Sequence, residues 1–550
     1  MQQSTALASA ASSPTILRNI ADLPGPRGLP LLGNLLQIDR TRVHASVEQW
    51  SREYGPLFRF RLASRQFMVV ADHDAISTLL RDRPDGFRRT SKLSEVWNEM
   101  GMPSGVFGAE GDNWQRQRRM VMAGFDPKHV KDYFPSLLKV TQRLRGRWQK
   151  AARGGQAIDL QADLMRFSVD ALAGLAFGAE VNTLESDEEV IQRHLDKIFP
   201  AMFKRILSQF PLWRYLKLPA DRALDRSVVA VNATIESFVA QARERMRQDP
   251  TLHTHPRNLL EAMIAAADRG DVDAKTVGAE PWTGLPATGS RPLGGQGAQA
   301  SVGAEPWTGL PATGSRPLGG QGAQASVGAP PLTDRDVAGN VLTMLLAGED
   351  TTANTLAWMI DLLRRNPQAL QKAQEEVRRV AGDSTAFTPE QMASLDYVEA
   401  CVHETMRLKP VAPFMAVQAL RDSVIADVRV PAGTLVWCAL RRDSLEERHF
   451  PDPLRFDPQR WLGEPGQPGQ ATHAAHAASS AKRISMPFGA GPRVCPGRYL
   501  ALLEMKMALA MLLAHFDVVA VDTPDGQAPR EKLAFTMTPV GLKMRLRERV

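Results

Sequence analysis

The sequence predicts a mainly α-helical protein with small β-sheets near both ends of the chain. After about residue 110, apolar residues recur at spacings of three and four, the period of an amphipathic helix. Residues 56–71 instead alternate and carry aromatic and β-branched side chains, which predicts a hairpin of two strands. Alternating patterns return at 424–440 and 533–546, so we expect strands there as well.

The composition is that of a globular chain that can bury a large core. Of its 550 residues, 43 % are apolar and 23 % charged, and the net charge is +7 with a pI near 9.4. Three widely spaced cysteines predict neither a disulfide framework nor a zinc site, so we expect a reducing, cytoplasmic location. Lysine and arginine form no long block, which favours an acidic protein partner over nucleic acid.

The chain begins with a tail and a stiff entry to the fold. Residues 1–22 are mostly small and polar and contain no apolar run near the ~20 residues that span a bilayer, so we expect a disordered tail. Pro24, Pro26 and Pro30 then impose an extended conformation. Residues 23–550 are predicted to form a single domain.

The helical patterns are interrupted once. They lie at 132–151, 191–207, 228–246, 258–270, 333–348, 366–382 and 498–516. Residues 277–301 recur without a change at 302–326, with nine Gly or Pro in each 25-residue copy and no apolar period. We expect a disordered tandem-repeat loop at 277–326, inserted into the single domain, with a partner-binding linker as the alternative.

One cysteine lies in an unusual loop. Cys495 occupies the middle of PFGAGPRVCPGRYLA, just before a helix predicted from Arg498, where free N–H groups favour a thiolate. Gly489 allows the backbone to approach a flat group closely, and Phe488 offers a ring to pack against it. A thiolate in such a loop suits the axial ligand of a haem iron, whereas the alternative is a buried, inert cysteine.

This loop resembles the haem-binding signature of the cytochrome P450 family, and the resemblance runs from about residue 23 to the C-terminus, apart from the repeat. The pattern F-G-x-G-x-R-x-C-x-G is filled by Phe488, Gly489, Gly491, Arg493, Cys495 and Gly497. The resemblance implies the cytochrome P450 fold, with haem b (iron protoporphyrin IX) between a long distal helix and the proximal cysteine loop. Cys495 is then the axial ligand of the iron.

Further motifs of the family concern the haem propionates. Trp114 and Arg118 match W-x-x-x-R on a predicted helix, and the resemblance places both on the propionates. Arg493 is carried over to the same role, because a planar guanidinium pairs well with a carboxylate.

Another motif concerns the stability of the proximal side. Glu404 and Arg407 match E-x-x-R and share a helix face. The family joins them to an arginine in a P-x-R-[FW] stretch, here Arg460. The implied role of these three residues is structural.

The distal side is the stretch LLAGEDTTANT. The family motif A-G-x-[DE]-T-[TS] is matched there by Ala347, Gly348, Asp350, Thr351 and Thr352. Oxygen activation needs protons, and the pattern predicts that Thr351 and Asp350 are catalytic. The Thr351 hydroxyl is expected to stabilise the oxygen species that is being activated, and the Asp350 carboxyl to relay protons to it from water. Gly348 is expected to leave room for oxygen over the iron, and a salt-bridged structural acid is the alternative for Asp350.

The resemblance implies a cytochrome P450 monooxygenase, an oxidoreductase that inserts one oxygen atom from dioxygen into a hydrophobic organic substrate, as in hydroxylation. Substrate contacts are expected from 91–107, 197–217, 411–417 and 534–538. The 197–217 stretch is apolar and basic, so a weak contact with a membrane surface is an alternative. The alternatives for the function are a haem-thiolate peroxygenase or isomerase, and a haem sensor or electron carrier.

The electron supply is expected to come from separate redox partner proteins acting on a monomer. The sequence shows no cysteine cluster for iron–sulfur and no flavin pattern. The positive net charge of the chain favours an acidic electron donor, either a ferredoxin or a protein of the flavodoxin or reductase type. We expect it on the proximal face, near Arg116, Arg119, Arg498 and Lys506.

Overall fold

The structure is a computed structural model that describes residues 17–125, 127–178, 181–186, 191–208, 210–269, 331–382, 384, 386–462 and 480–549, with only the backbone of 127–130, 191 and 192. The tandem repeat 277–326 lies outside the described residues, and the disordered insertion stays a prediction. The expected helical protein with small sheets is confirmed.

The helices carry most of the fold. They are α1 (Val43–Tyr54), α2 (His73–Arg81), α3 (Ser91–Glu99), α4 (Gly111–Gly124), α5 (Pro127–Arg153), α6 (Leu160–Phe177), α7 (Ile191–Leu207), α8 (Pro219–Gln248), α9 (Leu259–Arg269), α10 (Asp334–Arg365), α11 (Pro367–Ala381), α12 (Pro389–Ala393), α13 (Asp396–Leu408) and α15 (Arg498–His515). α8 begins nine residues before the predicted start, with Pro219 at its first position, where a missing N–H costs nothing.

In the part of the chain that the structure describes, the strands form four small sheets. They are β1 (Arg18–Asn19), β2 (Leu57–Leu62), β3 (Arg65–Val70), β4 (Phe87–Arg89), β5 (Ile158–Asp159), β6 (Phe414–Ala419), β7 (Ser423–Ile425), β8 (Val428–Val430), β9 (Leu435–Ala439), β10 (Phe516–Asp522), β11 (Glu531–Ala534), β12 (Thr536–Pro539) and β13 (Lys543–Glu548). The largest sheet has the order β2-β3-β9-β6-β4, and β2 and β3 form the predicted antiparallel hairpin. The others are β1-β8-β7, β10-β13-β5 and β11-β12.

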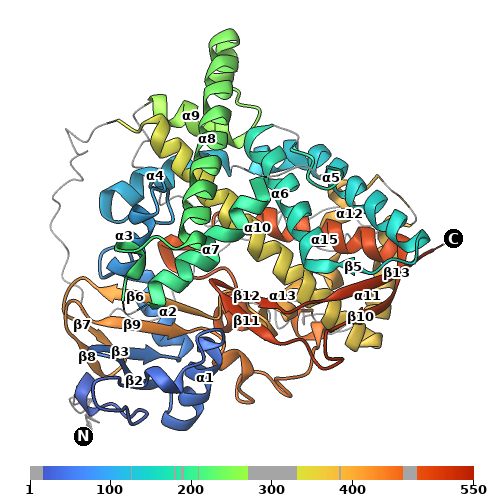
Figure 1. The fold of residues 1–550 in the computed structure, drawn as a ribbon. Helices are drawn as coiled ribbons and strands as arrows, with labels where there is room; N and C mark the ends of the chain where they lie inside the picture. The colour runs from blue at the N-terminus through green and yellow to red at the C-terminus, as the bar shows by residue number, and fades with distance from the viewer. Residues whose placement is uncertain are drawn as a thin grey trace, which may run out of the picture.

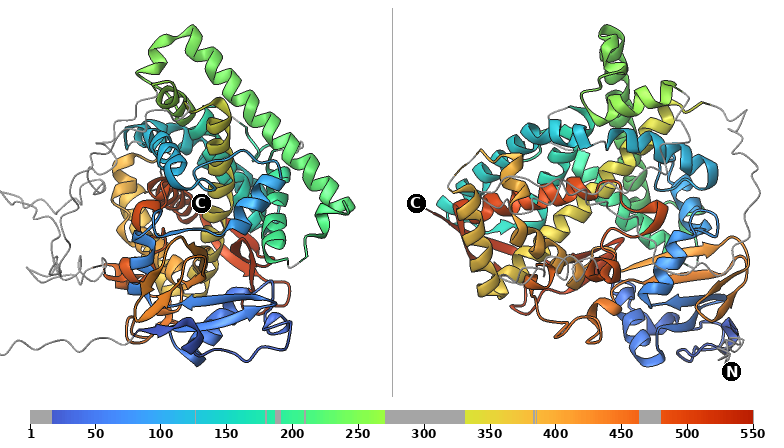
Figure 2. Two further views of the ribbon diagram at one scale, coloured as in Figure 1. Left: turned by 90° about the vertical axis from the view of Figure 1, so that its left-hand side faces the viewer. Right: turned by 180° about the vertical axis from the view of Figure 1, so that it is seen from behind.

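Most helices gather on one side of the molecule and the largest sheet lies on the other, together with α1 and α2 (Figure 1). α10 passes through the middle of the helical part, where it packs against α6, α8, α13 and α15. α8 lies obliquely along one side (Figure 2). The main apolar core fills the space between these helices, so α10 is held on several faces and provides a rigid support for polar side chains.

The N-terminal residues differ from the expected disordered tail 1–22. Of this segment the structure describes 17–22 and places Arg18–Asn19 parallel to β8, followed by a 3₁₀ turn at Ile20–Asp22. The Arg18 guanidinium donates to both carboxylate oxygens of Asp427, at 2.7 and 2.8 Å. This pairing joins residues more than 400 positions apart, which the local composition of the tail does not reveal.

Candidate active site

The cysteine loop is held by its own backbone. The N–H of Cys495 donates to the carbonyl oxygen of Phe488 at 2.9 Å, and the N–H of Gly489 donates to that of Met486 at 2.9 Å. Gly491 has φ +70, and a Cβ added to it would lie 2.4 Å from the backbone oxygen of Leu80 on α2. The loop therefore approaches α2 as closely as only glycine permits, immediately before α15 begins.

Cys495 differs from the other two cysteines in its surroundings. Cys401 and Cys438 are fully buried, whereas Cys495 keeps accessible surface. Burial raises the pKa of the Cys495 thiol nonetheless, although the Gly497 N–H and the Arg118 guanidinium lower it. A side chain that is enclosed by protein and still accessible is typical of the lining of an internal cavity. The thiolate that the sequence predicts at this helix N-terminus stays a prediction.

The expected propionate residues meet beside this loop. Arg118, on α4, donates from Nη2 to the carbonyl oxygen of Val494 at 2.8 Å. The Arg493 guanidinium lies over the Trp114 ring, 4.6 Å from its centroid, and pairs with Glu110 at 2.5 Å. Nε and Nη1 of Arg493 are buried and have no hydrogen-bond partner among the described residues.

Two more arginines join this cluster, and the sequence analysis missed them. Arg89, on β4, lies opposite Val417 of β6 and stacks its guanidinium 3.7 Å from the Phe107 ring centroid. Arg83 contacts the Met415 sulfur at 3.3 Å. Both arginines have buried N–H groups without a partner in the described part of the chain. The pairing of β4 with β6 places Arg89, and the contact with Met415 places Arg83, so no local motif could have revealed either residue.

The arginine cluster, which we define as Arg83, Arg89 and Arg493, needs anionic partners. Burial lowers the pKa of all three guanidinium groups, that of Arg493 to about 10. Unsatisfied buried N–H groups on cations are costly unless a carboxylate meets them. A flat cofactor with two carboxylates beside the cysteine loop would satisfy them. The residues present therefore fit haem.

The distal residues lie on α10. Thr351 donates from Oγ1 to its own helix, at 2.7 Å from the Ala347 carbonyl oxygen. Asp350 accepts from the Thr536 hydroxyl of β12 at 3.0 Å. Burial raises the pKa of Asp350 to about 6, and the Thr536 hydrogen bond opposes this rise. An acid of this pKa exchanges its proton near neutral pH, as a proton relay requires.

Gly348 is explained by packing against α6. A Cβ added to it would lie 2.8 Å from Cδ2 of Leu172, so the glycine lets α10 and α6 approach closely. The expectation that Gly348 leaves room for oxygen over the iron stays a prediction.

Glu349 is a further buried acid that the motif left unassigned. It is 3 % exposed, and its Oε1 has no partner among the described residues. Burial, together with Asp196 of α7 and the neighbouring Asp350, raises the pKa of Glu349 well above its usual value. Three carboxyl groups from two helices thus gather on the distal side.

The E-x-x-R motif forms a buried network of hydrogen bonds and ion pairs. Arg407 donates to both oxygens of Glu404 at 2.8 Å, and also to the carbonyl oxygens of Ser444 and Pro453. Nε of Arg460 lies 3.4 Å from Glu404 Oε1. Because Glu404 and Arg407 are both 0 % exposed, this network joins α13 to the segment before the cysteine loop, as the structural role requires.

Three of the four segments expected to contact substrate come together. The Phe535 ring stacks on Phe199 of α7, with centroids 4.4 Å apart, and meets Phe107 edge-on at 5.9 Å. These rings belong to 91–107, 197–217 and 534–538. An aromatic lining of this kind suits an apolar ligand.

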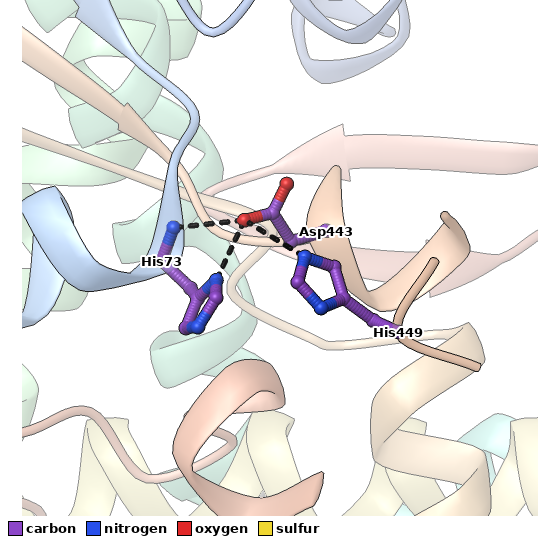
Figure 3. A group of neighbouring side chains, drawn as sticks. All are labelled: His73, Asp443 and His449. Carbon is purple, nitrogen blue, oxygen red and sulfur yellow. Dashed lines mark hydrogen bonds and ion pairs between the residues drawn. The ribbon is translucent and has the colours of Figure 1, made fainter. Parts of the chain in front are cut away.

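One other group in the described residues has the composition of a metal site. His73, Asp443 and His449 place their ligand atoms within 4.8 Å of one another (Figure 3). Asp443 Oδ2 accepts from the N–H and Nδ1 of His73 at 2.9 and 2.8 Å, while Oδ1 accepts from Arg442 and Arg448. Two guanidinium groups on this carboxylate oppose a cation, so the group ties α2 to the segment after β9.

Comparisons with known proteins agree with this geometry. The sequence model described as "Cytochrome P450" matches residues 23–280 and 321–546. The chain is 27 % identical over 527 residues to thromboxane-A synthase of Sus scrofa, across 92 % of this chain and 87 % of that protein. It is 26 % identical over 510 residues to a bifunctional cytochrome P450/NADPH–P450 reductase of Aspergillus oryzae, across 90 % of this chain and 39 % of that protein.

The fold has counterparts among solved structures. The crystal structure of the cytochrome P450DA heme domain superposes with a TM-score of 0.72 at 22 % identity, over 97 % of this chain and 99 % of that one. None of the described helices combines the length and the apolar character needed to cross a membrane.

Proposed function

The chain belongs to the cytochrome P450 family and is a haem-thiolate monooxygenase, and from this premise we propose that Cys495 is the cysteine whose sulfur binds the haem iron. The observation that supports the proposal most is the arginine cluster beside the one cysteine that keeps accessible surface. Trp114 and Arg118 border the same place.

The haem supplies the redox chemistry of oxygen when it is bound, and the protein supplies ligation, orientation and protons. Arg83, Arg89 and Arg493 would pair with its propionates, and Phe488 and Gly489 would border the ring on the cysteine side. On the other side, the Asp350 carboxyl holds a proton that can leave near neutral pH. The Thr351 hydroxyl, whose proton faces Ala347, offers an oxygen lone pair to an incoming donor.

The substrate is proposed to be a hydrophobic organic molecule that lies against the Phe107, Phe199 and Phe535 rings. Next to this region, Phe210 and Tyr215 are 76 % and 85 % exposed, with Arg214 and Lys217 between or beside them. We propose that this stretch makes a weak contact with a membrane surface from which an apolar substrate is taken up. We also propose that the protein is cytoplasmic and monomeric and that it does not bind nucleic acid.

An acidic electron donor is proposed for the proximal face. Arg116, Arg119 and Arg498 keep part of their surface accessible there. Lys506 does not belong to this set, because it is buried and donates to Glu399 at 2.9 Å. Some relatives carry their own reductase, as the name of the Aspergillus oryzae protein states, so the identity of the donor is part of the proposal.

The roles of the distal pair are tested by coupling. Thr351→Ala is expected to leave haem binding intact and to lower the ratio of product formed to electrons consumed, with peroxide released instead. Thr355→Ala is the matched control, because Thr355 makes the same type of hydrogen bond to the helix backbone one turn further on. An unchanged ratio in Thr351→Ala would remove Thr351 from the mechanism.

A further inference from the structure

The turn between β11 and β12 has an unusual backbone. Ala534 pairs with Thr536 in the antiparallel register, so Phe535 alone forms the tip of the hairpin. Phe535 has φ +92, a conformation that is rare for a residue with a bulky side chain. Such a conformation persists only where the surroundings impose it, and it tends to occur at functional sites.

Aromatic contacts hold this tip from one side. The Phe535 ring stacks on Phe199 at an interplanar angle of 13° and meets Phe107 edge-on. Phe199 belongs to α7, and Phe107 to the segment between α3 and α4. A ligand that entered between these elements would separate rings that now touch, and the tip would then lose the contacts that hold its strained backbone in place.

A hydrogen bond joins the same tip to the distal acid. Thr536 follows Phe535 directly, is 6 % exposed and donates from Oγ1 to Asp350 Oδ2 at 3.0 Å. The rest of the hairpin is anchored independently. Arg441 donates to Glu531 at 2.8 Å at its base, and Trp358 of α10 donates to the Met537 carbonyl oxygen at 3.3 Å.

We propose that Thr536 is a positioning residue for the Asp350 carboxyl. We propose further that a displacement of α7 moves the Phe535 ring, and through it the neighbouring Thr536. When a ligand separates Phe199 from Phe535, the backbone of Phe535 relaxes and the peptide leading to Thr536 turns. The hydroxyl then leaves Asp350. Without this hydrogen bond to its carboxylate form, Asp350 keeps its proton up to a higher pH when the cavity is occupied, an inference that rests on the relay role proposed above for this acid.

Other acids face the same place and change their charge with pH. Asp196 interacts with both Asp350 and Glu349, and Glu349 also interacts with Asp350. Thr536 is the neutral hydrogen-bond donor to Asp350. A measurement must therefore isolate Asp350. The infrared band of its protonated C=O, identified in the holoenzyme as the difference between wild type and Asp350→Asn, does so.

The test follows the titration of this band in four variants. Thr536→Val removes the hydroxyl that favours the carboxylate, so the midpoint should rise from about 6 by on the order of half a pH unit. Phe199→Ala should shift it in the same direction, and the double variant should titrate as Thr536→Val does, because both changes act through one hydrogen bond. Thr536→Ser, which keeps the hydroxyl, should restore the wild-type midpoint.

The control removes a stacked ring elsewhere. Phe238 of α8 stacks on Phe177 at 4.6 Å, so Phe238→Ala should weaken packing to a similar degree and leave the Asp350 midpoint unchanged. The proposal is overturned if Thr536→Val leaves the midpoint in place, if Phe199→Ala has no effect, or if the two shifts add. Failure of the relay role is a separate result, because it would show as an unchanged product ratio in Asp350→Asn.

Discussion

Glu504 should make the stability of this protein depend on pH. It lies on α15, is 3 % exposed and has one carboxylate oxygen without a partner in the described part of the chain. Burial raises its pKa from 4.5 to about 8, although a hydrogen bond with Thr352 of α10 opposes the rise. At neutral pH the folded protein therefore holds this carboxyl protonated, whereas the unfolded chain ionises it.

The sign and size of the effect follow from this pKa. Because the folded pKa is raised, the stabilisation is fully present below pH 4.5 and is lost as the pH rises to 8. Each unit changes the free energy of unfolding by about 1.4 kcal/mol, which gives about 3 kcal/mol between pH 5 and 7.5. With an unfolding entropy of ~2.1 cal/mol/K per residue over the 445 residues that the structure describes, 3 kcal/mol corresponds to ~3 °C in Tm.

The assay compares Glu504→Gln with wild type in thermal unfolding from pH 5 to 9. Glutamine keeps the shape and cannot ionise, so the two proteins should have similar Tm values at pH 5, and the variant should become the more stable as the pH rises. Glu375→Gln, an exposed position on α11, should show no such divergence. Parallel Tm curves for Glu504→Gln and wild type would refute a buried, neutral Glu504.

Three further predictions concern the haem, the repeat and the electron donor. Cys495→Ser should abolish the red-shifted Soret band of the reduced carbonyl complex, while Cys438→Ser, which changes a fully buried thiol, should retain it. The opposite result would show that Cys495 is not the ligand of the iron. Deletion of 277–326 should leave haem content and turnover within about twofold, since loop length changes closure entropy only slowly, and a variant unable to bind haem would show that the repeat packs. Reduction by an acidic donor should slow as salt rises and on Arg119→Glu, but not on Arg226→Glu of α8, and indifference to both salt and Arg119→Glu would place the donor elsewhere.

The sequence by itself determined the features that depend on short spacings. The glycine loop before a predicted helix singled out Cys495 as the candidate ligand of the haem iron. A separation of three residues placed Glu404 and Arg407 on one helix face, and a separation of four did the same for Trp114 and Arg118. Helical and alternating periods predicted the architecture for the same reason. These features are local, and backbone geometry decides them before any tertiary contact forms.

Only the tertiary structure decided which charges are buried and what faces them. Arg89 reaches the cysteine side because β4 pairs with β6, and Thr536 meets Asp350 across 186 positions of sequence. Lys506 had been expected at an exposed surface, yet α15 is buried on nearly every side and pairs it with Glu399. The cost of burying a charge depends on neighbours that are distant in sequence, so the pKa of Asp350 and Glu504 could be known only from the packed fold.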